Sequence, residues 1–236
     1  MRVLEIWRYP VKSLQGEQLD AALVTPVGIE GDRGYAIFDA ETGYGLTARR
    51  EPALLFASAR VVEGGVEITL PDGTIATDDA DLSHWLGREV HLRSNDEVVE
   101  RRFQNLVDFE DEGPDPAQWE AFDGARTSFR DSQAAVVSLV STGTLGDWDR
   151  RRFRANILLD GSGENELVGQ TVRLGGAVLE VQKRLGRCVM VTREQPGGIP
   201  KDLGVLRTVH REHDHTIAIG ATVEVAGAVS VGDEIR

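Results

Sequence analysis

The only cysteine of the 236-residue chain, Cys188, is a candidate metal ligand. It lies in LGRCVMVT at 185–192, directly after Arg187. A neighbouring positive charge lowers the pKa of a thiol, and the thiolate is the form that binds a soft metal. A lone cysteine is also often a small buried apolar residue. The residues by themselves therefore leave a metal ligand and a structural thiol open.

A run of arginines, RRRFR at 150–154, is the densest positive charge in an acidic protein. If residues 152–158 are extended, the side chains of Arg152, Arg154 and Asn156 point to one face, because side chains alternate along a strand. Two guanidiniums and an amide on one face suit a planar anion. A solvated charge run is the alternative interpretation.

Three histidines, His210, His213 and His215, lie in HREHDH, a spacing that also occurs around zinc or iron. The alternative is a polar loop between Leu206 and a strand that begins at Thr216. The glycine-containing stretch GSGENEL at 161–167 lacks the third glycine of a dinucleotide fingerprint. The sequence also contains no P-loop and no GxSxG elbow, which removes two common enzyme classes.

Composition narrows the function classes further. One cysteine cannot form an internal disulfide, a Cys-ligated iron–sulfur cluster or a multi-thiolate zinc site, so redox chemistry needs a cofactor from outside. A net charge of −13 makes nucleic acid and anionic membranes poor partners. The first residues, MRVLEIWRYPVKSL, are interrupted by charges, and no later run is apolar enough to span a membrane. We therefore expect a cytoplasmic protein.

The elements that must position these residues are mostly short strands. Strands are predicted at 2–7 and 34–38, and turn residues within 59–77 predict hairpins at 63–65 and 71–73, so that the first third forms an antiparallel meander. A short helix is predicted at about 79–86, capped by Asp78 or Asp79 and ended by Gly87.

The second half repeats short strands with helices between them. The predicted elements are strands at 134–141 and 155–161, a short helix around 144–148, a hairpin over 171–183 and two or three strands after Thr216. This pattern predicts a mainly β protein with a few short helices and a barrel-like architecture, not a doubly wound α/β sheet. We expect an N-terminal antiparallel β subdomain at 1–95, an acidic connector at 96–130 and a cofactor-binding domain at 131–236.

Eight segments together resemble the molybdenum-cofactor sulfurase C-terminal (MOSC) family with its N-terminal β-barrel companion. The same layout occurs in the amidoxime-reducing components of mitochondria. The segments are YPVKSLQG at 9–16, GIEGDRGYAI at 28–37, TARREP at 47–52, FRDS at 129–132, VSLVSTGTL at 137–145, RRFRANILLDG at 151–161, LGRCVMVT at 185–192 and VSVGDEI at 229–235. Each segment is weak evidence alone, but their order is specific.

The resemblance implies a bound molybdenum–molybdopterin cofactor with Cys188 as the metal ligand. The residues that it implies for binding the pterin and its phosphate are Lys12, Ser13, Arg33, Ser141, Thr142, Arg154, Asn156 and Arg187. Asp131 is implied as an acid that bonds a metal oxo group or water, or relays a proton. The chain departs from the family at Leu167, where an aromatic residue is frequent. The family also carries an association with pyridoxal phosphate.

The resemblance further implies an oxidoreductase that reduces small N-hydroxylated substrates, from N–OH or N–O to N–H. Electrons are expected from a separate ferredoxin- or flavoprotein-type donor, because one cysteine cannot hold an iron–sulfur cluster. One alternative is a non-catalytic carrier of the cofactor, or of sulfur as a persulfide on Cys188. The other is a binding module in which Cys188 is structural.

Overall fold

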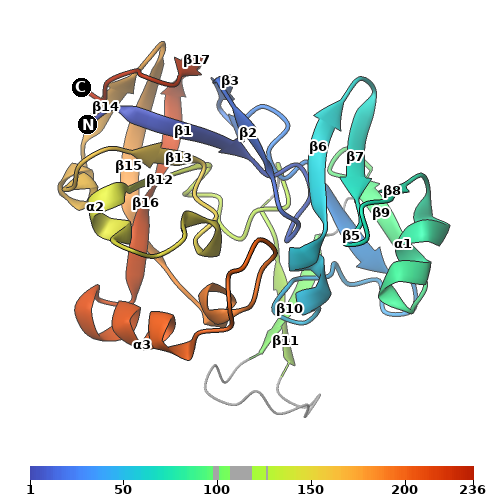
Figure 1. Cartoon of the computed structure of the whole chain (residues 1–236). Helices are drawn as coiled ribbons and strands as arrows, with labels where there is room; N and C mark the ends of the chain where they lie inside the picture. The colour runs from blue at the N-terminus through green and yellow to red at the C-terminus, as the bar shows by residue number, and fades with distance from the viewer. Residues whose placement is uncertain (98–100, 107–118, 126) are drawn as a thin grey trace. The chain divides into compact units, whose positions relative to one another are not determined.

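A computed structural model describes residues 1–97, 101–106, 119–125 and 127–236 (Figure 1). The chain divides into two compact units, and each is discontinuous in sequence. Unit 1 comprises residues 1–8, 18–30 and 132–236. Unit 2 comprises residues 9–17 and 31–131.

Unit 1 is built on a curled, half-barrel sheet of seven strands in the order β14-β15-β16-β12-β13-β1-β2. The strands are β1 (Val3–Arg8), β2 (Glu17–Leu19), β12 (Val137–Ser141), β13 (Ile157–Leu159), β14 (Thr171–Leu174), β15 (Ala177–Gly186) and β16 (Thr216–Val225). Only β12 and β13 are described as a parallel pair, and the other described pairs of this sheet are antiparallel. Figure 1 shows both chain termini beside β14.

A second, three-stranded sheet of unit 1 has the order β17-β3-β4, with β3 (Ala21–Thr25), β4 (Gly28–Ile29) and β17 (Gly227–Ser230). Alternation along β3 buries Ala22 and Val24 and exposes the residues between them, as expected of a strand with one buried face. These two side chains join a core made of the inward-facing Val, Leu and Ile residues of both sheets. The core therefore fixes β3 against strands that come more than a hundred residues later.

Unit 2 contains three small antiparallel sheets: β5-β9, β6-β7-β8 and β10-β11. Their strands are β5 (Tyr35–Asp39), β6 (Ser58–Val62), β7 (Gly65–Thr69), β8 (Ile75–Ala76), β9 (Val90–Ser94), β10 (Arg102–Leu106) and β11 (Trp119–Asp123). Phe38, Phe103 and Phe129 are buried together with Ala36, and their rings meet at tilted or edge-on angles that favour aromatic contact. Both predicted hairpins within 59–77 are confirmed by β6-β7 and β7-β8.

The helices are short. Helix α1 (Asp79–Leu86) confirms the predicted helix: the Asp78 carboxylate accepts bonds from two backbone amides of the first turn, and Gly87 ends the helix with a φ of 66°. Helix α2 is Thr142–Leu145, slightly earlier than expected, and α3 is Leu203–Glu212. The 3-10 turns η1, η3, η4 and η5 span Pro52–Phe56, Arg150–Arg152, Glu164–Leu167 and Val189–Thr192.

The mainly β, barrel-like architecture is confirmed, but the predicted meander of the first third is wrong. Strand β1 pairs with β13 and β3 pairs with β17, because their apolar faces are buried by strands from the end of the chain. The division at 1–95, 96–130 and 131–236 stays a prediction, and much of its connector lies outside the described residues.

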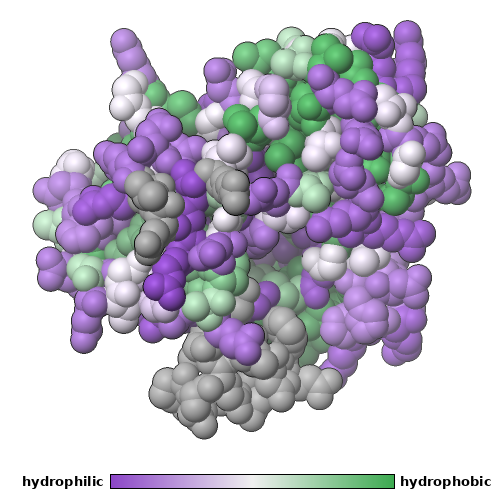
Figure 2. Space-filling model, turned by 180° about the vertical axis from the view of Figure 1, so that it is seen from behind, coloured by the Kyte–Doolittle hydropathy of each residue, from purple (hydrophilic) through white to green (hydrophobic). Residues whose placement is uncertain are grey.

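The face seen in Figure 2 is mostly hydrophilic, with smaller hydrophobic areas between the polar side chains. Exposed apolar side chains of unit 1 include Leu23, Val27 and Val231, at 45%, 44% and 44% exposure. Leu23 lies in the middle of β3, Val27 in the turn between β3 and β4, and Val231 directly after β17. Across the described parts of the chain, every helix is too short or too polar to cross a bilayer.

Candidate functional site

The predicted site residues form two groups, one in each unit. Unit 2 holds Lys12, Ser13, Arg33 and Asp131. Unit 1 holds Ser141, Thr142, Arg154, Asn156, Arg187 and Cys188.

In unit 2, backbone hydrogen bonds join three segments that are distant in sequence. The amide of Arg33 donates to the carbonyl of Tyr9 at 2.7 Å, and the amide of Phe129 donates to the carbonyl of Arg33 at 2.9 Å. The amide of Lys12 donates to the carbonyl of Tyr35 at 2.8 Å. The structure thereby brings Lys12, Arg33 and Asp131 to one place, although they come from three different loops.

A buried carboxylate, Asp32, lies at the centre of this group. Its Oδ2 accepts bonds from Arg33 Nη1 at 2.6 Å and from Arg130 Nη2 at 3.0 Å, and its Oδ1 accepts from the Tyr9 amide at 2.9 Å. Burial would raise the pKa of Asp32, but the two guanidiniums outweigh burial and lower it. Sequence reasoning missed Asp32 and Arg130, although both lie inside the segments GDR and FRDS that carried the resemblance.

The ammonium of Lys12 is buried and ion-paired. It donates to the carbonyl of Phe129 at 2.9 Å and to the carboxylate of Asp131, and it lies 4.6 Å from the centre of the Phe103 ring. Desolvation would raise the pKa of Asp131, but Lys12 and then Arg33 lower it, so this carboxyl is a poor proton donor at neutral pH. With Asp32 and Arg130, the cluster has three cations and two carboxylates, a net charge of one positive.

Two hydroxyl groups lie at the edge of this cluster. Ser13 Oγ accepts a bond from the amide of Ala48 at 3.0 Å, which places the neighbouring Thr47 close to Ser13. The Thr47 hydroxyl is buried and has no hydrogen-bond partner among the residues that the structure describes. Buried polar groups are nearly always hydrogen-bonded, so this hydroxyl is a donor suited to a ligand. Sequence reasoning quoted TARREP but did not single out Thr47.

In unit 1, Cys188 is half-buried and follows β15 at the start of η5. The guanidinium of the preceding Arg187 donates to two backbone carbonyls, through Nε to Ile217 at 2.7 Å and through Nη1 to Phe153 at 3.0 Å. In this structure Arg187 therefore fixes the backbone next to Cys188. The cysteine lies just beyond the end of β15, an inner strand of the sheet.

A β-bulge in β16 supplies one of these carbonyls. Thr216 pairs with Gly186 and Ile219 pairs with Arg184, so that two residues of β16 lie opposite one residue of β15. The second of them, Ala218, is fully buried and has a φ of 74°. A bulge removes a carbonyl from the strand ladder, and here the carbonyl of Ile217 accepts from Arg187.

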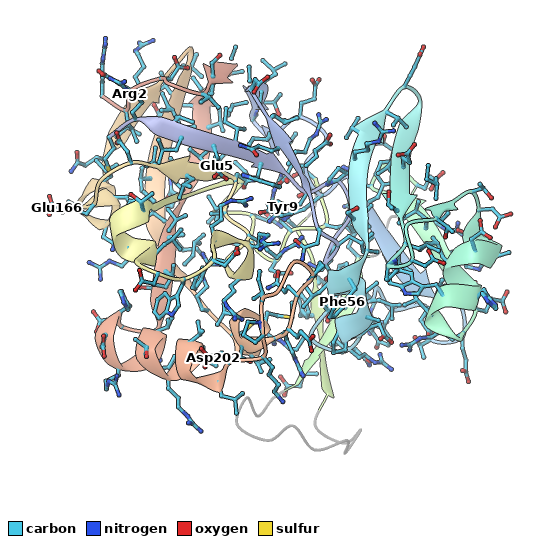
Figure 3. All side chains as sticks on the ribbon, in the orientation of Figure 1. Arg2, Glu5, Tyr9, Phe56, Glu166 and Asp202 are labelled. Atoms are coloured by element: carbon cyan, nitrogen blue, oxygen red, sulfur yellow. The ribbon has the colours of Figure 1, made fainter. Side chains whose placement is uncertain are left out.

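Ser141 and Thr142 lie at the same end of the sheet as Cys188. Strand β12 ends at Ser141 and runs parallel to β15, with β16 between them, so the two strand ends are about 10 Å apart at the usual strand spacing. Ser141 is fully buried, and its hydroxyl donates to Glu164 Oε2 at 2.6 Å. Thr142 is exposed and lines a cavity of about 350 Å³ together with Glu5, labelled in Figure 3, and Arg150.

The arginine run is not the extended strand that the alternation predicted. Residues 150–152 form the 3-10 turn η3, Arg154 has a φ of 51°, and β13 begins only at Ile157. Arg152, Arg154 and Asn156 therefore do not alternate along one strand face. Figure 3 labels Glu5, whose Oε2 accepts a bond from Arg150 Nε at 2.5 Å.

The amide of Asn156 is buried and joins three strands or strand ends. Its Oδ1 accepts from Ser138 Oγ at 2.9 Å, and its Nδ2 donates to the carbonyl of Trp7 at 3.2 Å. These contacts place Asn156 at the start of β12, about three residues along the strand from Ser141. Leu167, the predicted departure from the family, packs against the core of unit 1.

Three of the predicted ligands have a left-handed backbone. Ser13, Arg33 and Arg154 have φ angles of 71°, 54° and 51°. For residues other than glycine this conformation costs about 1–2 kcal/mol, and such strain is concentrated at functional sites. The family resemblance implied these three residues as ligands, and their backbone strain makes them candidates for a functional role on independent grounds.

The histidine segment is not the expected polar loop. Helix α3 extends to Glu212, so His210 lies in its last turn, and His213 ends it. Val205 and Val209 are buried one turn apart, which is the helical period that sequence reasoning overlooked here. The rings of His210 and His215 are 4.3 Å apart, but the described residues contain no group of three or more His, Cys, Asp or Glu side chains that would hold a metal.

Comparison with known proteins gives two family matches. The MOSC N-terminal beta barrel domain matches residues 1–113, and the MOSC domain matches residues 127–236. Among curated proteins, the chain is similar to mitochondrial amidoxime reducing component 2 of Bos taurus. The two are 24% identical over 276 residues, which cover 99% of this chain and 82% of the relative.

Among solved structures, the YUAD protein from Bacillus subtilis has a similar fold. Its TM-score is 0.50 with 13% sequence identity, and the match covers 99% of this chain and 93% of that one. At this identity the likeness concerns the fold alone. A hypothetical protein matches with a TM-score of 0.43 and 11% identity, over 100% of this chain and 66% of the other.

Proposed function

Because the chain belongs to the MOSC family, with the N-terminal barrel domain and the MOSC domain in order, we propose that it is a molybdenum-cofactor-dependent reductase of N-hydroxylated compounds. The MOSC family is associated with molybdenum-cofactor binding. The amidoxime-reducing relative, which the chain matches along 99% of its length, suggests the substrate class. Cys188 is the proposed metal ligand, and the proposed cofactor is molybdenum–molybdopterin. Binding of pyridoxal phosphate is not part of the proposal.

The observation that carries the proposal is the placement of Cys188. Arg187 anchors the backbone directly before it to Ile217 and Phe153, at the end of the sheet where Ser141 and Thr142 also lie. A soft thiolate donor suits a molybdenum centre that the pterin already holds through sulfur. A ligand on a fixed backbone loses little conformational entropy on binding a metal.

The donor set of unit 2 fits an anionic group such as the pterin phosphate. Lys12 and Arg33 provide charge, and Ser13 and the unpartnered Thr47 provide hydroxyls. Charge-assisted hydrogen bonds contribute about 1.5–3 kcal/mol each, so a few of them suffice for a tightly held cofactor. A net positive charge in an otherwise acidic chain supports the same assignment.

The other predicted site residues are also part of the proposal, and their expected roles differ: some contact the cofactor directly, and others support the fold or orient a neighbouring residue. Arg154 and Thr142 are proposed to contact the cofactor directly. Ser141 and Asn156 are bonded to Glu164 and Trp7, so their substitution is expected to lower stability as well as cofactor binding. We propose that Arg187 orients Cys188 and that ionised Asp131 orients Lys12 or accepts a hydrogen bond.

The proposed reaction consumes two electrons and two protons and converts N–OH into N–H and water. The bound cofactor supplies the redox chemistry, while the residues of this chain bind it and hold its ligand in place. Electrons are proposed to come from a separate ferredoxin- or flavoprotein-type donor in the cytoplasm. The substrate is a small molecule that carries an N–OH or N–O group.

Elemental analysis tests this proposal most directly. Protein purified from a host that makes the cofactor should carry close to one molybdenum per chain and reduce an amidoxime with a reduced dye as donor. Cys188→Ala should lose the activity and most of the metal. Val189→Ala, which trims a buried neighbour, is the packing control and should keep both. Wild-type protein without molybdenum or pterin would overturn the proposal.

A carrier function is the second candidate, because Cys188 is only half-buried and open to sulfur transfer. A sulfur carrier should take one sulfane sulfur from a persulfide donor, which leaves as a thiol, and so form a persulfide on Cys188 without molybdenum; mass spectrometry would detect the added mass of about 32 Da, one sulfur atom. A metal-loaded protein that turns over substrate and takes up no persulfide excludes the carrier.

A further inference from the structure

The segment that follows Cys188 lacks the support of a sheet. Residues 189–202, all of which are described, contain no named strand between the end of β15 at Gly186 and the start of α3 at Leu203. The backbone amides of the segment donate to carbonyls nearby in sequence, as the amide of Val191 does to the carbonyl of Cys188 at 3.2 Å. A segment outside any strand ladder needs another means of fixing its conformation.

Arg152 provides that means. Its side chain is buried, with 7% exposure for the residue. Nη1 donates to the carbonyls of Val191 at 3.1 Å and Arg193 at 3.2 Å, and Nη2 donates to the carbonyl of Pro200 at 2.7 Å. One guanidinium therefore donates hydrogen bonds to three carbonyls, two near the start of the segment and one near its end.

The neighbouring arginine adds a fourth carbonyl. Arg151 Nη1 donates to Pro196 at 3.0 Å while its other nitrogens bond Asp149. Gly197 has a φ of 77°, and a Cβ there would come within 2.7 Å of Arg151 Nη1, so glycine permits this close approach. The two arginines of η3 thus fix the segment along its length.

The bond pattern connects Arg152 to Cys188 itself. The carbonyl of Val191 accepts from Arg152, and the amide of the same residue donates to the carbonyl of Cys188. On the other side, Arg187 anchors the residue before the cysteine to Ile217 and Phe153. Cys188 is therefore held between two guanidiniums, those of Arg187 and Arg152.

We propose that Arg152 is a positioning residue that fixes the turn carrying Cys188, so that the thiol is preorganised for its ligand. This role depends on the proposed function only for the identity of the ligand that Cys188 binds. Burial lowers the pKa of Arg152, as expected for a cation whose direct partners are uncharged carbonyls. A lysine cannot reproduce the arrangement, because one ammonium lacks the planar fork that spans three carbonyls.

The test compares Arg152→Met with Arg150→Met in the full chain. Both variants remove a guanidinium from η3, but Arg150 bonds Glu5 and stacks 3.5 Å over the ring of Trp7, away from the cysteine segment. Because Cys188 is the only thiol, its alkylation by iodoacetamide in metal-free protein is site-specific. Hydrogen exchange of the amides at 189–202 reports the order of the segment.

In Arg152→Met we expect alkylation and exchange at 189–202 to be faster by about tenfold or more, and dialysis to remove molybdenum from the loaded protein faster. Arg150→Met should leave the alkylation rate and the exchange rate at the wild-type level. Arg152→Lys, the variant more certain to fold, should lie between them. Unchanged exchange and alkylation in both Arg152 variants would overturn the positioning role.

The same measurements separate this inference from the proposed function. If wild-type protein binds no molybdenum, the proposed function fails, while faster exchange in metal-free Arg152→Met still supports the positioning of Cys188. If wild-type protein binds molybdenum and Arg152→Met neither loses it faster nor exchanges faster, the inference alone fails.

Discussion

Two threonine hydroxyls of unit 2, one at the exposed Thr42 and one at the buried Thr47, differ in one informative respect. The hydroxyl of Thr42 donates to Asp39 Oδ1 at 2.8 Å, whereas the buried hydroxyl of Thr47 has no partner within the described ranges. A satisfied hydroxyl stabilises the fold, and an unsatisfied one costs about 1–3 kcal/mol. At the scale of single residues, a group that the fold does not use is therefore the better candidate for a ligand contact.

Thr47→Val is expected to lower cofactor retention about tenfold, equivalent to one hydrogen bond of ~1.4 kcal/mol. The Tm of the metal-free protein should stay the same or rise, because an unpaired hydroxyl is replaced by a methyl group. Molybdenum content after dialysis and thermal unfolding measure the two effects.

The comparison variant, Thr42→Val, removes a hydrogen-bonded hydroxyl at an exposed position and should show the opposite pattern, with a slightly lower Tm and unchanged retention. If Thr47→Val lowers the Tm and keeps the cofactor, Thr47 is an ordinary structural residue.

At the scale of elements, the bulge in β16 connects strand geometry to the cysteine. Ala218 has a left-handed backbone in the middle of a buried strand, and the displaced carbonyl of Ile217 accepts from Arg187. The backbone strain persists because pairing with β15 and β12 holds both sides of the bulge.

Ala218→Val should destabilise the protein by about 2 kcal/mol or more, because a β-branched side chain tolerates a positive φ poorly and the site is fully buried. Urea unfolding measures the change. Ala221→Val is the comparison, since Ala221 is equally buried on the same strand but has an ordinary φ. Equal losses in the two variants would mean that overpacking alone, without backbone strain, explains the result.

At the scale of the whole molecule, unit 1 is assembled from both ends of the chain. Strand β1 pairs with β13, β3 pairs with β17, and the amide of Ile235 donates to the carbonyl of Met1 at 2.9 Å. Residues 132–236 alone would leave the edges of β13 and β17 unpaired and their apolar faces exposed.

A fragment of residues 132–236 is therefore expected not to fold. A permuted fragment, in which a short flexible linker joins Arg236 to Met1 and the chain ends at Glu30, should fold because the termini are already adjacent. Circular dichroism and the dispersion of amide NMR signals distinguish the two outcomes. A cooperative unfolding transition in the shorter fragment would contradict this prediction.

Sequence reasoning identified much of the fold because it depends on local signals. Asp78 and Gly87 delimit α1, and the EGG and PDG turns at 63–65 and 71–73 form the hairpins of unit 2. Alternation of buried and exposed residues gave the strand positions. The prediction was wrong at α3: the polar residues of HREHDH suggested a loop, although Val205 and Val209 have the spacing of a buried helix face.

For the site, the sequence by itself determined which residues are candidates for the chemistry: one thiol, Cys188, and cationic segments whose order identifies the family. Only the tertiary structure decided what each group does. It bonds the side chains of Asp32 and Arg130 to each other, leaves Thr47 unpartnered and directs Arg152 to the backbone after Cys188. The reason is physical: long-range pairing sets which polar groups the fold itself satisfies, and no local pattern in the sequence records that pairing.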